Sequence, residues 1–238
     1  MKRPTLRPIL FVLAVCGIAL RLWLARPGSV ETGSLPLPAG NISREEVIAI
    51  AQSYVEHRWQ GSNANIKHGP DSQGVEVQTP ESVEKAGEKI GIPYKWGGFD
   101  TPESFDQGIR EQKAAGDIYS SDKRKKGDSA VSSDAVGIDC SGFVSRCWKL
   151  PDKYGTASLP GLCEALGSCD ELKPGDIMDQ PRGHVLLFAK WLDDSKSSAL
   201  FYDADGGAQA RVVAGVHRLA LLRLMGAKPF RYKRIRDK

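Results

Sequence analysis

The sequence predicts a mixed α+β domain, in which helices come first and an antiparallel sheet follows. Apolar residues recur at helical spacing in residues 44–58 and again in residues 139–150. After Gly175 the pattern changes to short segments rich in Val, Leu, Phe and Tyr, which is typical of strands. These segments are residues 184–191, 199–204, 211–216 and 229–235. Because the helices precede the strands without alternating, the order favours an α+β fold over a parallel βαβ sheet.

Composition and charge exclude several classes of protein. The chain has 238 residues, of which 41% are hydrophobic and 26% are charged, so collagen-like, coiled-coil and disordered chains are excluded. The formal net charge is +4, but five cations and no acidic residue lie in residues 1–30, which leaves −1 for residues 31–238. A nearly neutral body gives no electrostatic reason to expect a nucleic-acid partner.

The first residues predict export. A cationic start is followed by a continuous apolar run from Ile9 to Leu20, which is typical of a secretory signal peptide or an uncleaved signal anchor over residues 1–25. Leu13-Ala14-Val15-Cys16 also suggests a lipoprotein box, so lipidation of Cys16 is an alternative. Residues 26–41 predict a linker and residues 42–238 a single extracytoplasmic domain, in contact with a membrane only through the leader.

Within the domain, helix signals and loop signals alternate. Ser43 and Glu46 form a capping box for the helix at 44–58, and Thr79 with Pro80 predicts a second helix that ends at Gly91. Residues 60–76 predict a loop. Residues 99–136 predict a surface insertion, whose basic run Lys123-Arg124-Lys125-Lys126 is either a solvated loop or a contact for an anionic polymer.

Cysteine usage leaves one question open. Outside the cytoplasm, Cys163 and Cys169 could close a small disulfide loop or remain two free thiols. Cys147 lies on the same helix face as Cys140 and is expected to be buried. Since no CxxC pair or His-x-x-x-His spacing is present, we expect no metal site.

Three residues predict nucleophilic catalysis. Cys140 lies in the first turn of a helix capped by Asp139, where unpaired amides and the helix dipole favour a thiolate. His184 opens the first long strand, so it can lie at the sheet edge and act as the base. Asp203 lies near the end of the next strand, where a hairpin would bring it beside His184 to orient the imidazole. Asp205, two residues further on, is the competing candidate.

Several other residues have a structural interpretation. Asp176 is expected to form hydrogen bonds at a turn, Trp148 is expected to pack in the core, and His217 to lie on the surface. For His57 and His68 the sequence identifies no partner.

Four motifs together resemble the NlpC/p60 cysteine peptidases. They are Pro93-Tyr94-Lys95-Trp96-Gly97-Gly98, Asp139-Cys140-Ser141-Gly142-Phe143-Val144, Leu172-Lys173-Pro174-Gly175-Asp176-Ile177 and Gly183-His184-Val185, in the order of that family. The resemblance covers about residues 90–207. It implies a papain-like fold, with the nucleophile helix packed on a small antiparallel sheet, and the hydrolysis of amide bonds in cell-wall peptides.

The resemblance also implies roles for individual residues. Cys140 matches the nucleophile, His184 the base and Asp203 the third catalytic residue. The residues expected near the substrate are Tyr94, Trp96, Asp139, Ser141 and Ser158. The long stretch between Gly98 and Cys140 and the segment from Gly155 to Cys169 depart from the family pattern, so the scissile bond stays open.

The sequence therefore predicts a monomeric, cofactor-free cysteine hydrolase that acts on peptidoglycan stem peptides outside the cytoplasm. Two alternatives remain. One is an amidase or acyl transferase that uses the same triad on a substrate outside the cell wall. The other is an inactive wall-binding module in which Cys140 is an ordinary core thiol.

Overall fold

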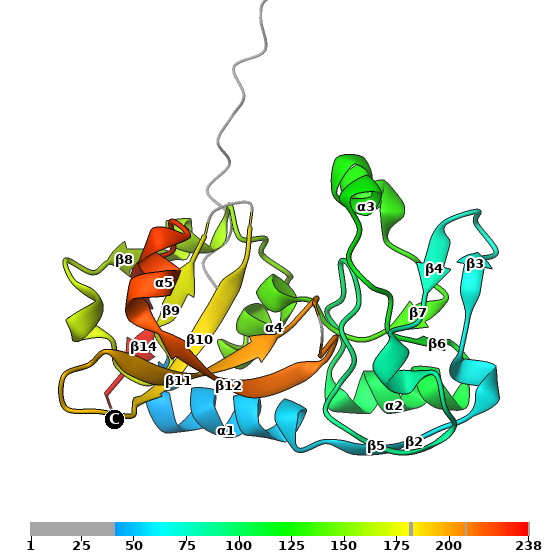
Figure 1. Ribbon diagram of the computed structural model, residues 1–238, viewed down its shortest axis with the longest axis horizontal. Coiled ribbons are helices and arrows are strands. Elements are labelled where there is room, and N and C mark those ends of the chain that lie inside the picture. The colour runs from blue at the N-terminus through cyan, green and yellow to red at the C-terminus, as the bar shows by residue number, and fades with distance from the viewer. Residues whose placement is uncertain (1–40, 181–182, 208, 238) are drawn as a thin grey trace, which may run out of the picture. The chain divides into compact units, whose positions relative to one another are not determined.

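The computed structural model describes residues 41–180, 183–207 and 209–237. The predicted leader, Cys16 and the predicted linker up to residue 40 lie outside the described residues. Of the described residues, 30% are helix and 31% are strand, so neither type of element dominates and the fold is mixed, as the α+β prediction requires (Figure 1).

The regular elements are mostly short. The α-helices are α1 (Arg44–Val55), α2 (Pro102–Arg110), α3 (Ser121–Lys126), α4 (Cys140–Cys147) and α5 (Leu219–Leu224). The strands are β1 (Ile42–Ser43), β2 (Arg58–Gly61), β3 (His68–Pro70), β4 (Glu76–Gln78), β5 (Gly87–Ile90), β6 (Ala114–Ala115), β7 (Ala135–Val136), β8 (Cys163–Ala165), β9 (Ile177–Asp179), β10 (Val185–Trp191), β11 (Ser198–Ala204), β12 (Val212–Arg218), β13 (Lys228–Tyr232) and β14 (Ile235–Arg236).

A six-stranded sheet forms the centre of the domain. Its strand order is β12-β11-β10-β9-β13-β8, and every neighbouring pair is antiparallel. The four segments expected to be strands correspond to β10, β11, β12 and β13. The antiparallel sheet predicted for the second half of the chain is therefore confirmed.

Helices cover both faces of this sheet. Alternate residues of β9 and β10, such as Ile177 and Leu187, belong to one buried cluster together with α1 and α4. Met178 and Phe188 face the other side, where Leu219 and Leu222 of α5 pack on them. Because side chains alternate along a strand, each face of the sheet has its own apolar layer.

The first helix has the predicted cap and face. The amide of Glu46 donates to Ser43 Oγ at 3.1 Å, which satisfies one of the unpaired amides of the first turn. Val47, Ala51 and Tyr54 are buried against α4 and the sheet. The helix ends at Val55, three residues before the predicted end.

The predicted helix between Pro80 and Gly91 is wrong. Glu81–Val83 form a single 3-10 turn, and Gly87–Ile90 form β5, which pairs with β2. Gly87 has φ 134° and Gly91 has φ 81°, values that end right-handed helical backbone. The loop predicted at 60–76 is also partly wrong, since the short hairpin β3–β4 begins within it.

Residues 99–136 are more than a surface insertion. Phe105 of α2 and Ala114 of β6 have no exposed surface, and Lys123 of the basic run is buried beside the carboxylate of Asp117. The run therefore lies on the short helix α3 with its first residue facing inward. The predicted solvated loop is partly wrong: the run is helical and Lys123 neutralises a buried carboxylate, although the other three basic residues are exposed.

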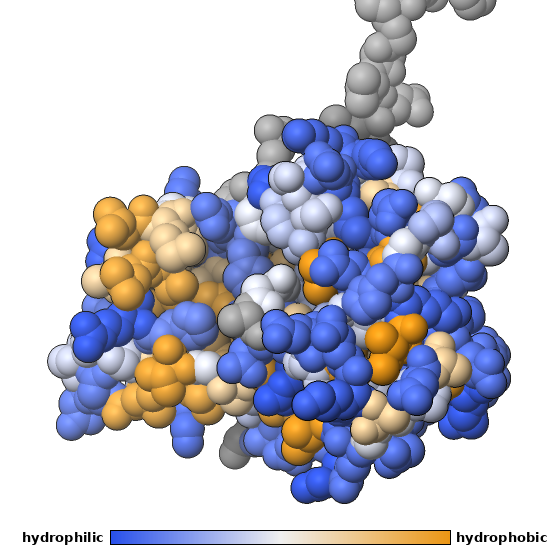
Figure 2. Space-filling view, turned by 45° about the vertical axis from the view of Figure 1, so that its right-hand side comes forward, coloured by the Kyte–Doolittle hydropathy of each residue, from blue (hydrophilic) through white to orange (hydrophobic). Residues whose placement is uncertain are grey.

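The surface of the domain is uneven in character. Figure 2 shows apolar side chains gathered over the sheet side of the displayed face and mostly hydrophilic ones over the side of α2 and α3. The most exposed large apolar residues include Leu221, Leu224 and Met225, at or just after α5. Within the described ranges, no helix is both long and apolar enough to cross a membrane.

Candidate active site

Cys140 is the first residue of α4 and lies at the centre of the candidate site. Asp139 caps the helix, because its Oδ1 accepts hydrogen bonds from the Gly142 amide at 2.7 Å and from Ser141 Oγ at 3.0 Å. Its Oδ2 lies 2.8 Å from Lys153 Nζ, which compensates the buried charge. Among the described residues, the amides of Cys140 and Ser141 have no acceptor. They are therefore available to a developing negative charge at the thiol.

Two glycines let α4 approach the backbone at Gly98 closely. A Cβ on Gly142 would lie 2.1 Å from the carbonyl oxygen of Gly98, and a Cβ on Gly98 would lie 2.5 Å from the carbonyl oxygen of Gly137. The amide of Asp139 donates to Gly98 O at 3.3 Å. Gly98 and Gly142, which lie far apart in the sequence, are therefore in direct backbone contact.

His184 immediately precedes β10 and faces two partners. Its Nε2 lies 2.7 Å from Asp203 Oδ1, and the ring also interacts with the Cys140 thiol. Since Nε2 faces the carboxylate, Nδ1 is the ring nitrogen left for the sulfur. The His184 side chain is 37% exposed, whereas Cys140 is 8% exposed. Solvent and substrate can therefore reach the pair from the imidazole side.

The surroundings of His184 favour its charged form. Burial lowers the pKa of His184, but its contacts with the Asp203 carboxylate and the Cys140 thiol, and the negative charges of both, raise that pKa well above its ordinary value. A histidine that keeps its proton beside a cysteine stabilises a thiolate, which is the reactive form of the nucleophile.

The structure separates the two candidate carboxylates. Asp203 contacts His184, whereas Asp205 accepts hydrogen bonds from the amides of Gly207 at 2.7 Å and Gln209 at 2.9 Å. Asp205 therefore holds a turn. Asp203 also borders a hollow of about 630 Å³, which is lined in part by Arg211 and His217.

Tyr94 lies close to Cys140. It is buried, and its ring lies so near Gly206 that a Cβ there would meet it at 3.1 Å. Burial raises the pKa of Tyr94, and the negative charges of Cys140 and Asp139 raise it further. The phenol therefore keeps its proton near the thiol and can act as a hydrogen-bond donor.

The other predicted substrate residues differ in their placement. Ser141 and Asp139 are buried at the helix start, in contact with each other. Trp96 is half-buried, packs on Tyr119 with ring centroids 5.7 Å apart, and donates to Gly127 O at 3.3 Å. Ser158 is exposed just before the 3-10 turn Leu159–Leu162, and none of its contacts among the described residues reaches Cys140 or His184.

The remaining cysteines are not arranged for chemistry. Cys147 is fully buried, as predicted, and burial raises its pKa well above the ordinary value. Cys163 and Cys169 are both free thiols, so of the two alternatives the structure has the one without a disulfide. Cys163 donates to Leu159 O at 3.3 Å.

Residues without an assigned role in the sequence acquire structural partners. Asp176 is buried, accepts the Lys173 amide at 2.9 Å, and pairs with Arg44 and Arg231, as its predicted turn role requires. Trp148 stacks on Tyr232 with ring centroids 4.8 Å apart, which confirms its place in the core.

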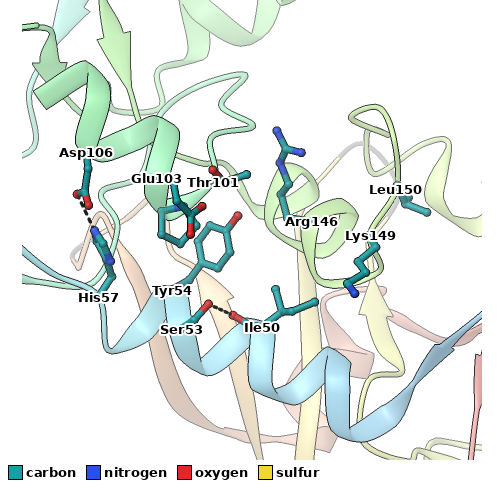
Figure 3. Close-up of a pocket in the computed structure, with 11 residues that line it drawn as sticks. Ile50, Ser53, Tyr54, His57, Thr101, Glu103, Asp106, Arg146, Lys149 and Leu150 are labelled. Atoms are coloured by element: carbon teal, nitrogen blue, oxygen red, sulfur yellow. Dashed lines mark hydrogen bonds and ion pairs between the residues drawn. The ribbon is translucent and has the colours of Figure 1, made fainter.

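A second hollow lies away from Cys140. It has a volume of about 610 Å³ and is lined by residues of α1 and α2 and by residues at and after the end of α4 (Figure 3). Here His57 Nε2 lies 2.8 Å from Asp106 Oδ1, a partner that the sequence did not identify. Since Arg146 and Lys149 line it at the far end of α4 from the nucleophile, this hollow is separate from the candidate site. Across the ranges 41–180, 183–207 and 209–237, no group of His, Cys, Asp and Glu could hold a metal ion.

Sequence reasoning missed Asp179, the last residue of β9. It is fully buried, and neither of its carboxylate oxygens has a hydrogen-bond partner in the part of the chain that the structure describes. Burial raises the pKa of Asp179 to about 7, and the opposing influence is the positive charge of His184. A single Asp before Gln-Pro is typical of a turn, so the sequence carried no signal for this position.

Comparison with protein families, with curated proteins and with solved structures finds no match for this chain.

Proposed function

We propose that this chain is a cysteine hydrolase of the NlpC/p60 kind, with a papain-like fold, which cleaves amide bonds in peptidoglycan stem peptides outside the cytoplasm. The observation that carries the chemistry is the meeting of Cys140, His184 and Asp203, which come from α4, the start of β10 and the end of β11. The substrate class rests on the four sequence motifs.

The geometry supports a two-step reaction. The Cys140 thiolate attacks the amide carbonyl carbon, and the free amides of Cys140 and Ser141 stabilise the negative oxygen of the tetrahedral intermediate. His184 then donates its proton to the leaving amine as the C–N bond breaks, which leaves a thioester on Cys140. Water attacks the thioester, His184 accepts the proton from that water, and the carboxylic acid leaves as the thiolate re-forms.

The neighbouring residues support these steps. Asp203 holds the imidazole ring through Nε2, so that Nδ1 faces the sulfur. In this mechanism the buried phenol of Tyr94, which keeps its proton, serves as a hydrogen-bond donor to a substrate carbonyl. Asp139 and Ser141 form the polar wall at the helix start. The proposed enzyme works as a monomer without a cofactor, and its leader directs it to the cell envelope.

Digestion of purified muropeptides tests the proposal. We expect wild-type protein to release new amine and carboxyl ends that mass spectrometry locates on the stem peptides, and Cys140→Ala to release none while keeping its circular dichroism spectrum. Cys169→Ala is the matched control, because Cys169 is a partly exposed thiol outside the site and its removal should leave the rate unchanged.

The same digest separates the alternatives. If the protein turns over small amides or acyl donors but leaves the muropeptides uncleaved, an amidase or acyl transferase with the same catalytic residues is favoured. Hydrolysis that persists in Cys140→Ala would contradict the mechanism itself.

A further inference from the structure

The outward face of α5 is apolar and exposed. Leu219 and Leu222 pack inward on the sheet, whereas Leu221, Leu224 and Met225 are 56%, 83% and 62% exposed. We call these three exposed side chains the α5 patch. Figure 2 shows apolar side chains gathered on the sheet side of the displayed face, the side on which Figure 1 labels α5. Because an apolar patch at the surface of a monomer often marks a contact with a partner or a membrane, the patch is a candidate contact surface.

Three exposed cations flank the α5 patch. Arg218 directly precedes α5, Arg223 lies within it, and Lys228 opens β13 three residues after Met225. Among the described residues, none of the three cations forms an ion pair or a side-chain hydrogen bond. The chain around them is strongly basic, since residues 206–236 contain eight Lys and Arg and no Asp or Glu. The apolar side chains therefore lie in a positively charged surrounding.

Acidic side chains lie in two turns beside α5 and not on the helix. Asp193 belongs to the turn between β10 and β11, which contacts the start of α5 through a hydrogen bond from the Leu219 amide to Ser197 O at 3.0 Å. Its carboxylate accepts hydrogen bonds from serines of that same turn. Asp170 lies in a second turn, and both it and Arg223 act electrostatically on the Cys169 thiol. The charge on α5 itself is only positive.

A second copy of the chain does not fit this surface. In a symmetric dimer the same patch meets itself, so Arg218, Arg223 and Lys228 would face the same three cations. Like charges opposed across an interface are unfavourable. Three outward apolar side chains are also few beside the roughly 20–30 residues a side of a stable interface. The patch instead fits a negatively charged partner that offers an apolar layer behind its charges.

We propose that the α5 patch docks the domain on an anionic lipid bilayer, with the three apolar side chains at the boundary between head groups and acyl chains and the flanking cations on the lipid phosphates. Short amphipathic helices bind bilayers in this way, through an apolar face and neighbouring Lys and Arg side chains. Charge complementarity decides the partner, because an anionic bilayer presents phosphates and an apolar layer at one surface. The inference goes beyond the proposed hydrolysis and does not depend on it. It adds a contact of the domain itself to the membrane contact predicted for the leader.

Hydrogen–deuterium exchange of the full-length chain tests the proposal. The chain is mixed with vesicles of phosphatidylcholine alone or of phosphatidylcholine with phosphatidylglycerol, and exchange is followed in peptides that cover residues 216–228. We expect exchange in this segment to slow with the phosphatidylglycerol vesicles and to stay unchanged with phosphatidylcholine alone. The reason is that only the first surface offers both an apolar layer and net negative charge.

Two paired variants separate the apolar contribution from the charged one. Leu221→Ser combined with Leu224→Ser should abolish the slowing, and so should Arg218→Gln combined with Arg223→Gln. All four residues except Arg223 lie outside any printed interaction of their side chains, and all four are exposed, so both variants should keep the circular dichroism spectrum of the wild type.

Ile90→Ser and Lys85→Gln change an exposed apolar residue and an exposed cation outside α5, and they are the matched controls that should keep the slowing.

Several results would overturn the inference. They are slowing that is absent with both vesicle types or equal with both, and slowing that survives in either paired variant. Slowing that grows with protein concentration in the absence of vesicles would mean that a second copy covers the patch, and slowing by soluble polyglutamate without lipid would mean an acidic protein partner. No arm of the experiment contains peptidoglycan, so failure of the muropeptide digest and failure of this inference are distinguishable.

Discussion

Asp203 reaches His184 from a diagonal position across β10 and β11. Leu187 pairs with Tyr202, so the same register continued toward the strand ends places Asp205 directly opposite His184. Diagonal neighbours on one sheet face are within reach of a histidine ring and a carboxylate. Asp203 makes this contact because the side chain of Asp205 is held by the amides of its own turn.

The first prediction separates the two aspartates by their effect on turnover. Asp203→Asn should lower kcat/KM on muropeptides by roughly 10²-fold or more, because the imidazole loses the charge that orients it and stabilises its protonated form. Asp205→Asn should change kcat/KM by much less. The rates are measured at fixed pH with both variants shown to be folded, and an equal loss in the two variants would contradict the assignment.

The second prediction concerns the close approach of Gly98 and Gly142. Gly142→Ala places a methyl group 2.1 Å from the Gly98 carbonyl oxygen, so α4 must move. We expect a loss of about 1–3 kcal/mol or more in the free energy of unfolding, measured by urea denaturation. Gly161→Ala is the control, since a Cβ there would meet nothing within 4 Å and φ is not in the left-handed region. Equal free energies of unfolding in the two variants would show that the backbone around Gly98 and Gly142 can adjust to the extra methyl group at no cost.

The third prediction concerns the basic run on α3. Burial raises the pKa of Asp117, and the hydrogen bond from Lys123 opposes that rise. Lys123→Met leaves the Asp117 charge buried and unpaired, which should cost about 3–5 kcal/mol in the free energy of unfolding. Lys125→Met removes an exposed lysine of the same helix and should change stability by less than about 1 kcal/mol. If both substitutions change the free energy of unfolding by similar amounts, Lys123 is solvated like Lys125 and the solvated-loop interpretation holds.

The fourth prediction is a pH dependence of stability at Asp179. Its pKa is about 7 in the folded protein and about 4 in an unfolded chain, so the folded state binds the proton more strongly. The stability contributed by Asp179 is therefore present below about pH 4 and is lost as the pH rises to about 7. Asp179→Asn should match wild type near pH 4 and exceed it by a few kcal/mol at pH 8, at about 1.4 kcal/mol per pH unit.

Urea denaturation of both proteins across this range provides the measurement. A stability difference between the two proteins that is independent of pH would mean that Asp179 has the same protonation state throughout, and would contradict the sign given above.

The sequence predicted best where one strong local signal acted alone. The apolar runs that became β10 and β11 are buried strands in any context, and the caps at Ser43 and Asp139 define their helices through hydrogen bonds within four residues. The three candidate catalytic residues were named from motif order and strand position. Their meeting at one point, and the choice of Asp203 over Asp205, required the register of the sheet.

The errors lie where distant contacts decide the structure. Residues 84–90 contain helix-compatible side chains, but Gly87–Ile90 pair with β2, and the Trp59 indole donates to Gly91 O at 3.1 Å. The burial of Lys123 depends on Asp117, whose own burial no local pattern indicates. Asp179 was missed for the same reason, since its burial arises only when β9 pairs with β10 and β13.

The contact between Gly98 and Gly142 also makes residues 99–139 a closed excursion of the chain. Both ends of this excursion are pinned at the nucleophile by the hydrogen bond from Asp139 to Gly98. A peptide bond cut at its exposed tip near Asp128 would therefore leave two fragments that still hold each other at the cysteine. Proteolytic nicking in this region would therefore split the chain on a denaturing gel while the surroundings of Cys140 stay intact.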